Sequence, residues 1–139
     1  MKTTYLVSGN RKIIASEWGD KKNPMVVMLH GGGQTRHSWK GSASKIADLG
    51  FHVITYDLRG HGESFWDEDG NYTFNAHKDD LIKIIKQNDK KANLIGASLG
   101  GMVSLSLAGH EKERDYCSSL TMVDIGIRPN DKGSERIID

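Results

Sequence analysis

The chain has 139 residues, a length that fits one domain. Lysine and arginine number 19 against 18 aspartate and glutamate residues, so a net charge of +1 gives no field that would attract nucleic acid or an anionic membrane. The single cysteine excludes an internal disulfide, and the N-terminal sequence MKTTYLVSGNRK has no apolar core of signal-peptide length. The longest aliphatic run, 25–29, is too short to span a membrane, so we expect a soluble, cytoplasmic protein.

The order of apolar segments predicts an α/β fold. TTYLVS and KIIASEW, separated by GNRK, are typical of an antiparallel hairpin. Continuous aliphatic runs then predict buried parallel strands at 25–30, 51–57, 93–97 and 119–124. Helices are expected at 38–49, at 75–88 with Thr73 or Asn75 as the N-cap, and from Ser98 to Gly109. We therefore predict a single domain over 1–139, a mostly parallel sheet with an antiparallel N-terminal hairpin and helices on both faces.

Glycines cluster directly after three of these strands, and the last cluster, GASLGG at 96–101, fits the pattern G-x-S-x-G around Ser98. Where a strand turns abruptly into a helix, the apex residue is strained and exposed, and glycines two residues away let strand and helix approach. The helix N-terminus and the next backbone N–H then favour negative charge at the serine oxygen. This context predicts Ser98 as a nucleophile; the alternative is a small residue in a packed turn.

The cluster HGGGQTRHSW, from His30 to Trp39, follows the first buried strand and is expected at the same edge of the sheet. Its glycines leave backbone N–H groups unshielded, as an oxyanion hole requires. The alternative is a flexible or phosphate-binding loop, although neither G-x-x-x-x-G-K-[ST] nor G-x-G-x-x-G occurs in the chain. We expect His30 to form structural hydrogen bonds beneath the loop rather than to transfer protons.

The cluster YDLRGHGES, at 56–64, combines charged residues with turn-forming glycines. Asp57 and Arg59 are candidates for an ion pair, and Gly60 and Gly62 would allow a tight turn beside the site. We interpret this segment as one that maintains the fold rather than one that takes part in catalysis.

In this order and spacing, HGGG at 30–33, DLRGHGES at 57–64 and GASLGG at 96–101 resemble the N-terminal half of an α/β-hydrolase, over almost the whole chain. The resemblance implies Ser98 as the nucleophile and the backbone N–H groups of Gly32 and Leu99 as the oxyanion hole. It implies neither a metal nor an organic cofactor. A serine here, rather than the aspartate of dehalogenase and epoxide-hydrolase members, implies an acyl-enzyme formed from an ester, thioester or related small acyl substrate. GGGQTRHSW and VDIGIRP further resemble bacterial esterases and perhydrolases, and the choice between these and a C–C hydrolase stays open.

The chain departs from the family in its catalytic base. The family's triad runs along the chain from Ser to Asp or Glu and then to His, but no histidine follows His110. A helix of ordinary rise would place His110 about 18 Å from Ser98, and His37 and His61 match family positions with other roles. Asp124 is a candidate acid, although an aspartate at a strand end is more often structural.

We therefore interpret 1–139 as the N-terminal part of an α/β-hydrolase core, through its sixth strand and the start of the cap region. Without its base, the fragment is expected to be inactive, or orders of magnitude slower than an enzyme with a full triad. The strand at 119–124 would become a sheet edge, which predicts a homo-oligomer or swapped dimer. The alternative is a non-catalytic α/β-hydrolase-like module that binds a ligand or protein partner.

Overall fold

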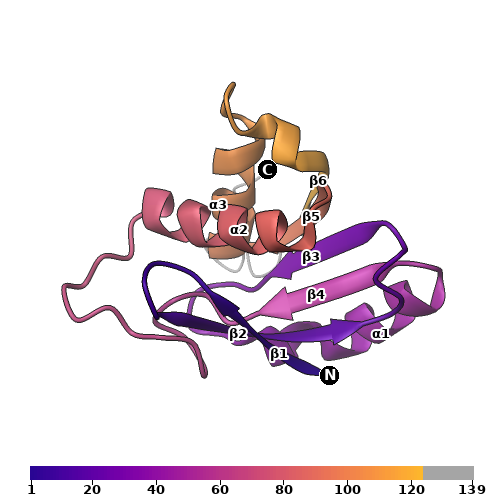
Figure 1. Ribbon diagram of the computed structural model, residues 1–139, viewed down its shortest axis with the longest axis horizontal. Helices are drawn as coiled ribbons and strands as arrows, with labels where there is room; N and C mark the ends of the chain where they lie inside the picture. The colour runs from indigo at the N-terminus through magenta and orange to yellow at the C-terminus, as the bar shows by residue number, and fades with distance from the viewer. Residues whose placement is uncertain (124–139) are drawn as a thin grey trace, which may run out of the picture.

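Residues 1–123 are described by the computed structural model, and their strands form one mixed sheet (Figure 1). The sheet order is β1-β2-β4-β3-β5-β6, with antiparallel pairing from β1 to β4 and parallel pairing across β4, β3, β5 and β6. The predicted fold class is confirmed, and strand ends shift by one or two residues. The strands are β1 (Lys2–Leu6), β2 (Lys12–Trp18), β3 (Met25–Leu29), β4 (His52–Tyr56), β5 (Ala92–Ala97) and β6 (Cys117–Val123).

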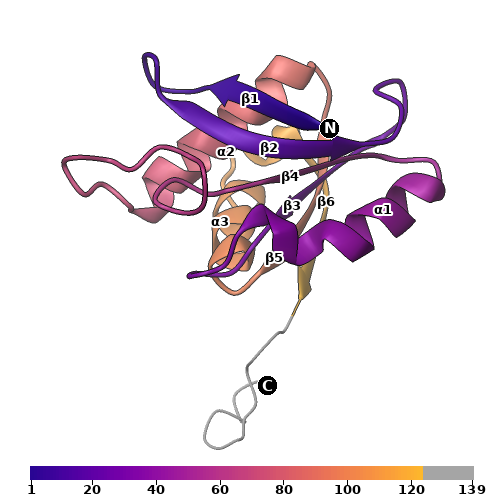
Figure 2. The same cartoon turned by 90° about the horizontal axis from the view of Figure 1, so that it is seen from below.

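Helices cover both faces of the sheet, with α1 on one face and α2 and α3 packed together on the other (Figure 2). The predicted first helix begins later than expected, because residues 36–39 form a 3₁₀ turn before it. Within residues 1–123, no helix has both the length and the apolar character needed to cross a bilayer. The helices are η1 (Arg36–Trp39), α1 (Lys40–Asp48), α2 (Phe74–Asn88), α3 (Leu99–Ala108) and η2 (Arg114–Tyr116).

The core explains why the central strands read as continuous apolar runs. Every residue of β3 and β4 is buried, because helices cover these strands on both sides. On one face, Leu81, Ile84 and Ile85 of α2 meet the sheet together with α3. Helix α2 is fixed at its start by Thr73, whose hydroxyl accepts a hydrogen bond from the Ala76 N–H at 3.1 Å. Thr73 rather than Asn75 is therefore the N-cap.

The strand order places two loops side by side at one edge of the sheet. From β3 the chain passes through α1 to β4 on one side, and it then passes through α2 to β5 on the other side of β3. In open α/β sheets, the carboxyl ends of two strands that diverge in this way frame a crevice where ligands bind. The loop after β3 and the turn after β5 both lie at this end of the sheet, and they carry two of the three glycine clusters of the sequence.

Candidate active site

The turn between β5 and α3 holds Ser98 in an unusual backbone conformation. Its φ is 52° and its ψ is −116°, and within residues 1–123 only Asp89 is another non-glycine residue at positive φ. Asp89 ends α2 in the left-handed conformation that helix C-termini commonly adopt, whereas Ser98 begins a helix. Backbone strain of this kind costs about 1–3 kcal/mol and persists only where surrounding contacts enforce it.

The contacts that enforce the turn are between backbones. A Cβ atom on Gly96 would lie 2.5 Å from the carbonyl oxygen of Gly100. A Cβ atom on Gly100 would overlap the carbonyl oxygen of Leu29, at the end of β3. Only glycine allows these approaches, so β5, α3 and β3 meet at this point with no side chain between them.

The Ser98 side chain is exposed at the start of α3, and its hydroxyl has no partner among residues 1–123. A serine at a helix N-cap commonly accepts a hydrogen bond from an N–H of the first turn. Here the Gly100 N–H of that turn donates instead to the backbone oxygen of His30, at 3.1 Å. A serine with only a structural role would be expected to cap the helix. The Ser98 hydroxyl does not cap it.

The loop after β3 has three consecutive glycine N–H groups, and two of them are engaged. The Gly31 N–H donates to Gln34 Oε1 at 2.9 Å. The Gly33 N–H donates to His61 Nε2 at 3.1 Å. The N–H of Gly32, between them, has no acceptor in the described part of the chain. Gly32 is thus the one donor of this cluster that a ligand can use.

The loop after β3 lies against the start of α3, with Gly32 next to Leu99 and Gly31 next to Ser98. A Cβ atom on Gly32 would lie 3.9 Å from Leu99 Cβ, and one on Gly31 would lie 3.4 Å from Ser98 Cβ. The Leu99 N–H, at the first position of α3, also has no acceptor among the described residues. When a serine hydroxyl attacks a carbonyl group, the carbonyl oxygen becomes an oxyanion. Free backbone N–H groups near the serine can stabilise that oxyanion.

His30 lies beneath this loop with both ring nitrogens occupied, as the sequence predicts. The side chain is fully buried, Nδ1 lies 2.7 Å from the Gly31 carbonyl oxygen, and Nε2 accepts a hydrogen bond from the Leu58 N–H at 3.1 Å. Burial lowers the pKa of the imidazole, and the two bonds fit a neutral ring protonated at Nδ1. His30 therefore ties the loop to the segment after β4 and has no free nitrogen to accept a proton.

No histidine of the chain hydrogen-bonds the Ser98 hydroxyl, and all six lie within residues 1–123. In His61 both nitrogens are engaged, since Nε2 accepts from Gly33 and Nδ1 lies 3.1 Å from the Arg59 carbonyl oxygen. His110 is exposed beyond the C-terminal end of α3. The candidate acid Asp124 and the expected cap region lie outside the described residues.

Asp57 and Arg59, the candidates for an ion pair, do not pair with each other, so this prediction is wrong. Asp57 is fully buried and accepts hydrogen bonds from the backbone N–H and the guanidinium of Arg36, which follows β3. Arg59 binds Asp80 of α2 through two hydrogen bonds, of 2.7 and 2.8 Å. Each charged group thus pairs with a residue from another element, a choice that depends on the tertiary fold. These pairs tie the loop to η1 and to α2, in keeping with the expected structural role.

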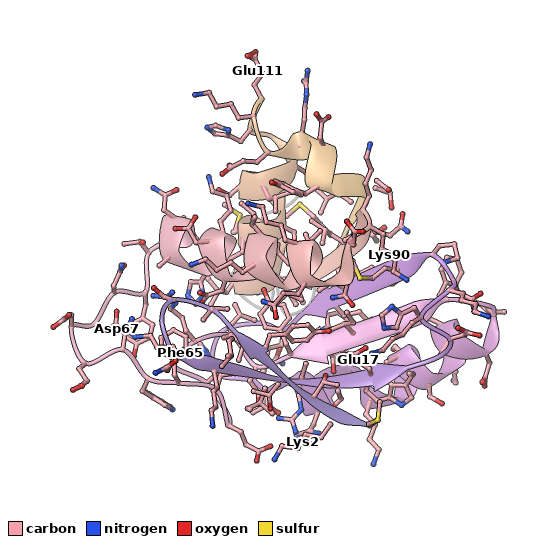
Figure 3. All side chains as sticks on the ribbon, viewed as in Figure 1. Lys2, Glu17, Phe65, Asp67, Lys90 and Glu111 are labelled. Carbon is pink, nitrogen blue, oxygen red and sulfur yellow. The ribbon has the colours of Figure 1, made fainter. Side chains whose placement is uncertain are left out.

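The loop at 57–73 projects from the end of the sheet toward which β3 and β4 point (Figure 3). The Arg59 guanidinium lies 4.9 Å from the centre of the Phe65 ring, a favourable cation–π distance. Further along, the Asp67 carboxylate accepts backbone N–H bonds from Asp69 and Asn71. Internal contacts of this kind support the loop beside the sharp turn between β5 and α3 at Ser98, which we call the elbow.

A cavity of about 290 Å³ between this loop, α2 and α3 was not anticipated from the sequence. His77 of α2 lines it, is 3% exposed and makes no side-chain hydrogen bond within the described residues. A helical signal for its burial exists, because His77, Leu81 and Ile84 fall on one face of α2. The lining is completed by residues 59–61, Trp66, Tyr72 and Leu99.

The chain is similar to proteins with the alpha/beta hydrolase fold, whose family model matches residues 24–136. An esterase of Mycobacterium tuberculosis is 37% identical over 114 residues, which cover 81% of this chain and 36% of the relative. A 3-hydroxybutyrate-oligomer hydrolase of Cupriavidus necator is 31% identical over 133 residues, which cover 94% of this chain and 44% of the relative. The chain thus spans less than half the length of these curated relatives.

Among solved structures, an epoxide hydrolase of Vigna radiata superimposes with a TM-score of 0.81. The match covers 93% of this chain and 41% of that chain, with 22% sequence identity. At that identity the likeness concerns the fold alone.

Proposed function

The chain belongs to the α/β-hydrolase fold family, and we propose that it supplies the nucleophile and oxyanion hole of a serine hydrolase that cleaves carboxylic esters. In this proposal residues 1–139 are the N-terminal part of the hydrolase core. The observation that carries it is the strained Ser98, whose hydroxyl is free beside the free N–H groups of Gly32 and Leu99.

The proposed reaction begins when Ser98 Oγ attacks the ester carbonyl carbon while its proton passes to a general base. The carbonyl oxygen becomes an oxyanion that accepts hydrogen bonds from the N–H groups of Gly32 and Leu99. Collapse of this intermediate breaks the C–O bond, and the alcohol leaves with the proton. Water then attacks the acyl-enzyme, which releases the acid and restores the serine.

The general base is the part that none of the six histidines supplies, since none hydrogen-bonds Ser98. In our proposal it is a histidine outside these 139 residues, in keeping with the greater length of the curated relatives. The same observation favours a second candidate function, a non-catalytic module that binds a ligand at the elbow. The two differ in what an added base does to ester hydrolysis.

Imidazole added to the buffer can replace an absent histidine, so the test is hydrolysis of p-nitrophenyl acetate by the 139-residue chain across an imidazole series. Imidazole also hydrolyses the ester by itself, and Ser98→Ala supplies the matched background. Without imidazole we expect turnover orders of magnitude below the roughly ten per second of an ordinary enzyme.

If the chain is part of a serine hydrolase, imidazole should raise the hydrolysis rate of the unchanged chain above the Ser98→Ala background. The exposed Ser38 is a control, and Ser38→Ala should keep the full excess. Identical rates for the unchanged chain and Ser98→Ala at every imidazole concentration would favour the binding module.

A further inference from the structure

The cavity between the 57–73 loop and the helices lies directly beside the proposed oxyanion hole. Leu99 lines this cavity, and its side chain also lies against Gly32, where a Cβ atom would be 3.9 Å from Leu99 Cδ2. On the loop side, His61 lines the cavity and is joined to Gly33 by a hydrogen bond. A group held in the cavity would therefore be the neighbour of a carbonyl bound at Ser98.

The walls of the cavity are mostly aromatic and aliphatic, and two of them are open to solvent. Trp66 is 67% exposed and Tyr72 is 38% exposed, large values for aromatic side chains that line a cavity. The Tyr72 hydroxyl is engaged, since it accepts a hydrogen bond from the Asp67 N–H at 2.7 Å. The aromatic surface thus faces outward without a partner in the described residues. The volume of the cavity suits a single ring or a short chain.

Arg59, His61 and His77 are the charged or imidazole side chains of the lining, and of these His77 alone has no hydrogen-bond partner among the described residues. Its side chain is almost completely buried, and Nδ1 is enclosed with no hydrogen bond among the described residues. Nε2 is the ring nitrogen left to reach the cavity that His77 lines. Because Nε2 also has no hydrogen bond among the described residues, a ligand hydroxyl that reaches it would add one hydrogen bond to the complex.

Among residues 1–123, no unbalanced charge lines the cavity. The Arg59 guanidinium is neutralised by two hydrogen bonds to Asp80 and donates a third to the Asn71 carbonyl oxygen at 3.0 Å. Burial, together with the nearby charge of Arg59, lowers the pKa of His77 to about 4, so its imidazole is neutral at pH 7. A carboxylate or phosphate finds no free cation here, and the site suits an uncharged group.

We propose that this cavity is a substrate subsite for an uncharged ring or short alkyl group that carries a hydroxyl, and that His77 hydrogen-bonds that hydroxyl. A neutral imidazole has one donor and one acceptor, and a hydroxyl can pair with either. The identification of the ligand as part of an ester rests on the proposed function. Binding to the cavity does not, because it needs no reaction at Ser98.

Phenol and toluene test the subsite, since they have the same number of non-hydrogen atoms and only phenol has a hydroxyl. Each is titrated into the isotope-labelled chain at pH 7, and binding is followed by NMR shifts of the backbone amides and of the His77 ring nitrogens. We expect phenol to bind roughly fivefold more tightly than toluene, the gain from one added hydrogen bond. Equal affinities would overturn the proposal.

Substitutions separate the polar contact from the apolar walls. His77→Phe keeps a ring of similar shape and should remove the preference for phenol, while His110→Phe, at an exposed position, should keep it. Trp66→Ala should weaken both ligands to a similar degree, and because Trp66 is exposed this variant remains informative should His77→Phe not fold. A preference that persists in His77→Phe, or affinities unchanged in Trp66→Ala, would contradict the proposal.

Failure of the subsite and failure of the proposed function give different results. Ser98→Ala should bind phenol as the unchanged chain does, because the hydroxyl of Ser98 is not part of the cavity lining. Selective phenol binding without imidazole-dependent turnover would leave the subsite standing and reject the hydrolase. Imidazole-dependent turnover without selective phenol binding would reject the subsite and leave the hydrolase standing.

Discussion

The strain at Ser98 predicts an inverted order of stability for two substitutions, Ser98→Gly and Ser98→Ala. Both remove the hydroxyl, but only glycine removes the Cβ atom that makes φ of 52° unfavourable. Relief of this strain should stabilise the folded state by about 1–3 kcal/mol. Glycine also makes the unfolded chain more flexible, which costs about 0.4–1 kcal/mol relative to alanine. The balance predicts that Ser98→Gly is more stable than Ser98→Ala by about 1 kcal/mol.

Urea unfolding followed by circular dichroism measures this difference. With a slope of about 1–3 kcal/mol per molar urea, the midpoints of the two variants should differ by roughly 0.3–1 M. Ser44, exposed in the interior of α1, provides the control pair. There the order should be normal, with Ser44→Gly about 0.5–1 kcal/mol less stable than Ser44→Ala. The same order at Ser98 as at Ser44 would refute the claim that the elbow is strained.

Three other predictions concern packing, pH and association. Gly100→Ala should lower the free energy of unfolding in urea by about 2–4 kcal/mol, because its methyl group would overlap the Leu29 carbonyl. Gly41 has open space around it, so Gly41→Ala should raise the free energy of unfolding by about 0.5 kcal/mol. Equal effects of the two substitutions would contradict the close approach of Gly100 to Leu29. Burial raises the pKa of the Glu17 carboxyl, but hydrogen bonds from His52 and Tyr5 outweigh this effect and lower it from 4.5 to about 2, so the stability from ionised Glu17 is present above pH 4.5 and lost toward pH 2. Between pH 4.5 and pH 2, the unfolding midpoint should therefore fall less steeply in Glu17→Gln than in the unchanged chain. Parallel curves for the two proteins would contradict this role of Glu17. Within residues 1–123, β6 lies at an edge of the sheet, so we expect concentration-dependent dimers of the 139-residue chain in light scattering; a monomer at every concentration would contradict this.

The fold could be predicted because local patterns and the tertiary structure agree. The short aliphatic runs around Met25–Leu29 and His52–Tyr56 are typical of strands covered on both faces, and the glycine clusters mark where those strands end. The elbow was predictable for the same reason, since the spacing around Ser98 has a backbone cause that involves only neighbouring residues and β3.

Long-range partners could not be predicted. Asp57 and Arg59 are two residues apart, yet their partners Arg36 and Asp80 come from segments whose proximity only the folded sheet creates. The free N–H of Gly32 likewise depends on Gln34 and His61 engaging its two neighbours, which a glycine run does not disclose. His77 had a local signal, its place on the apolar face of α2, but the cavity beside it requires the loop at 57–73.

Covalent labelling shows whether Ser98 is a nucleophile. The 139-residue chain is incubated with a fluorophosphonate in the presence of imidazole, digested, and mapped by mass spectrometry. We expect one phosphonate, on the peptide that contains Ser98, formed faster than on any other serine and absent from Ser98→Ala. Labelling spread over exposed serines such as Ser38, at rates unchanged in Ser98→Ala, would contradict it.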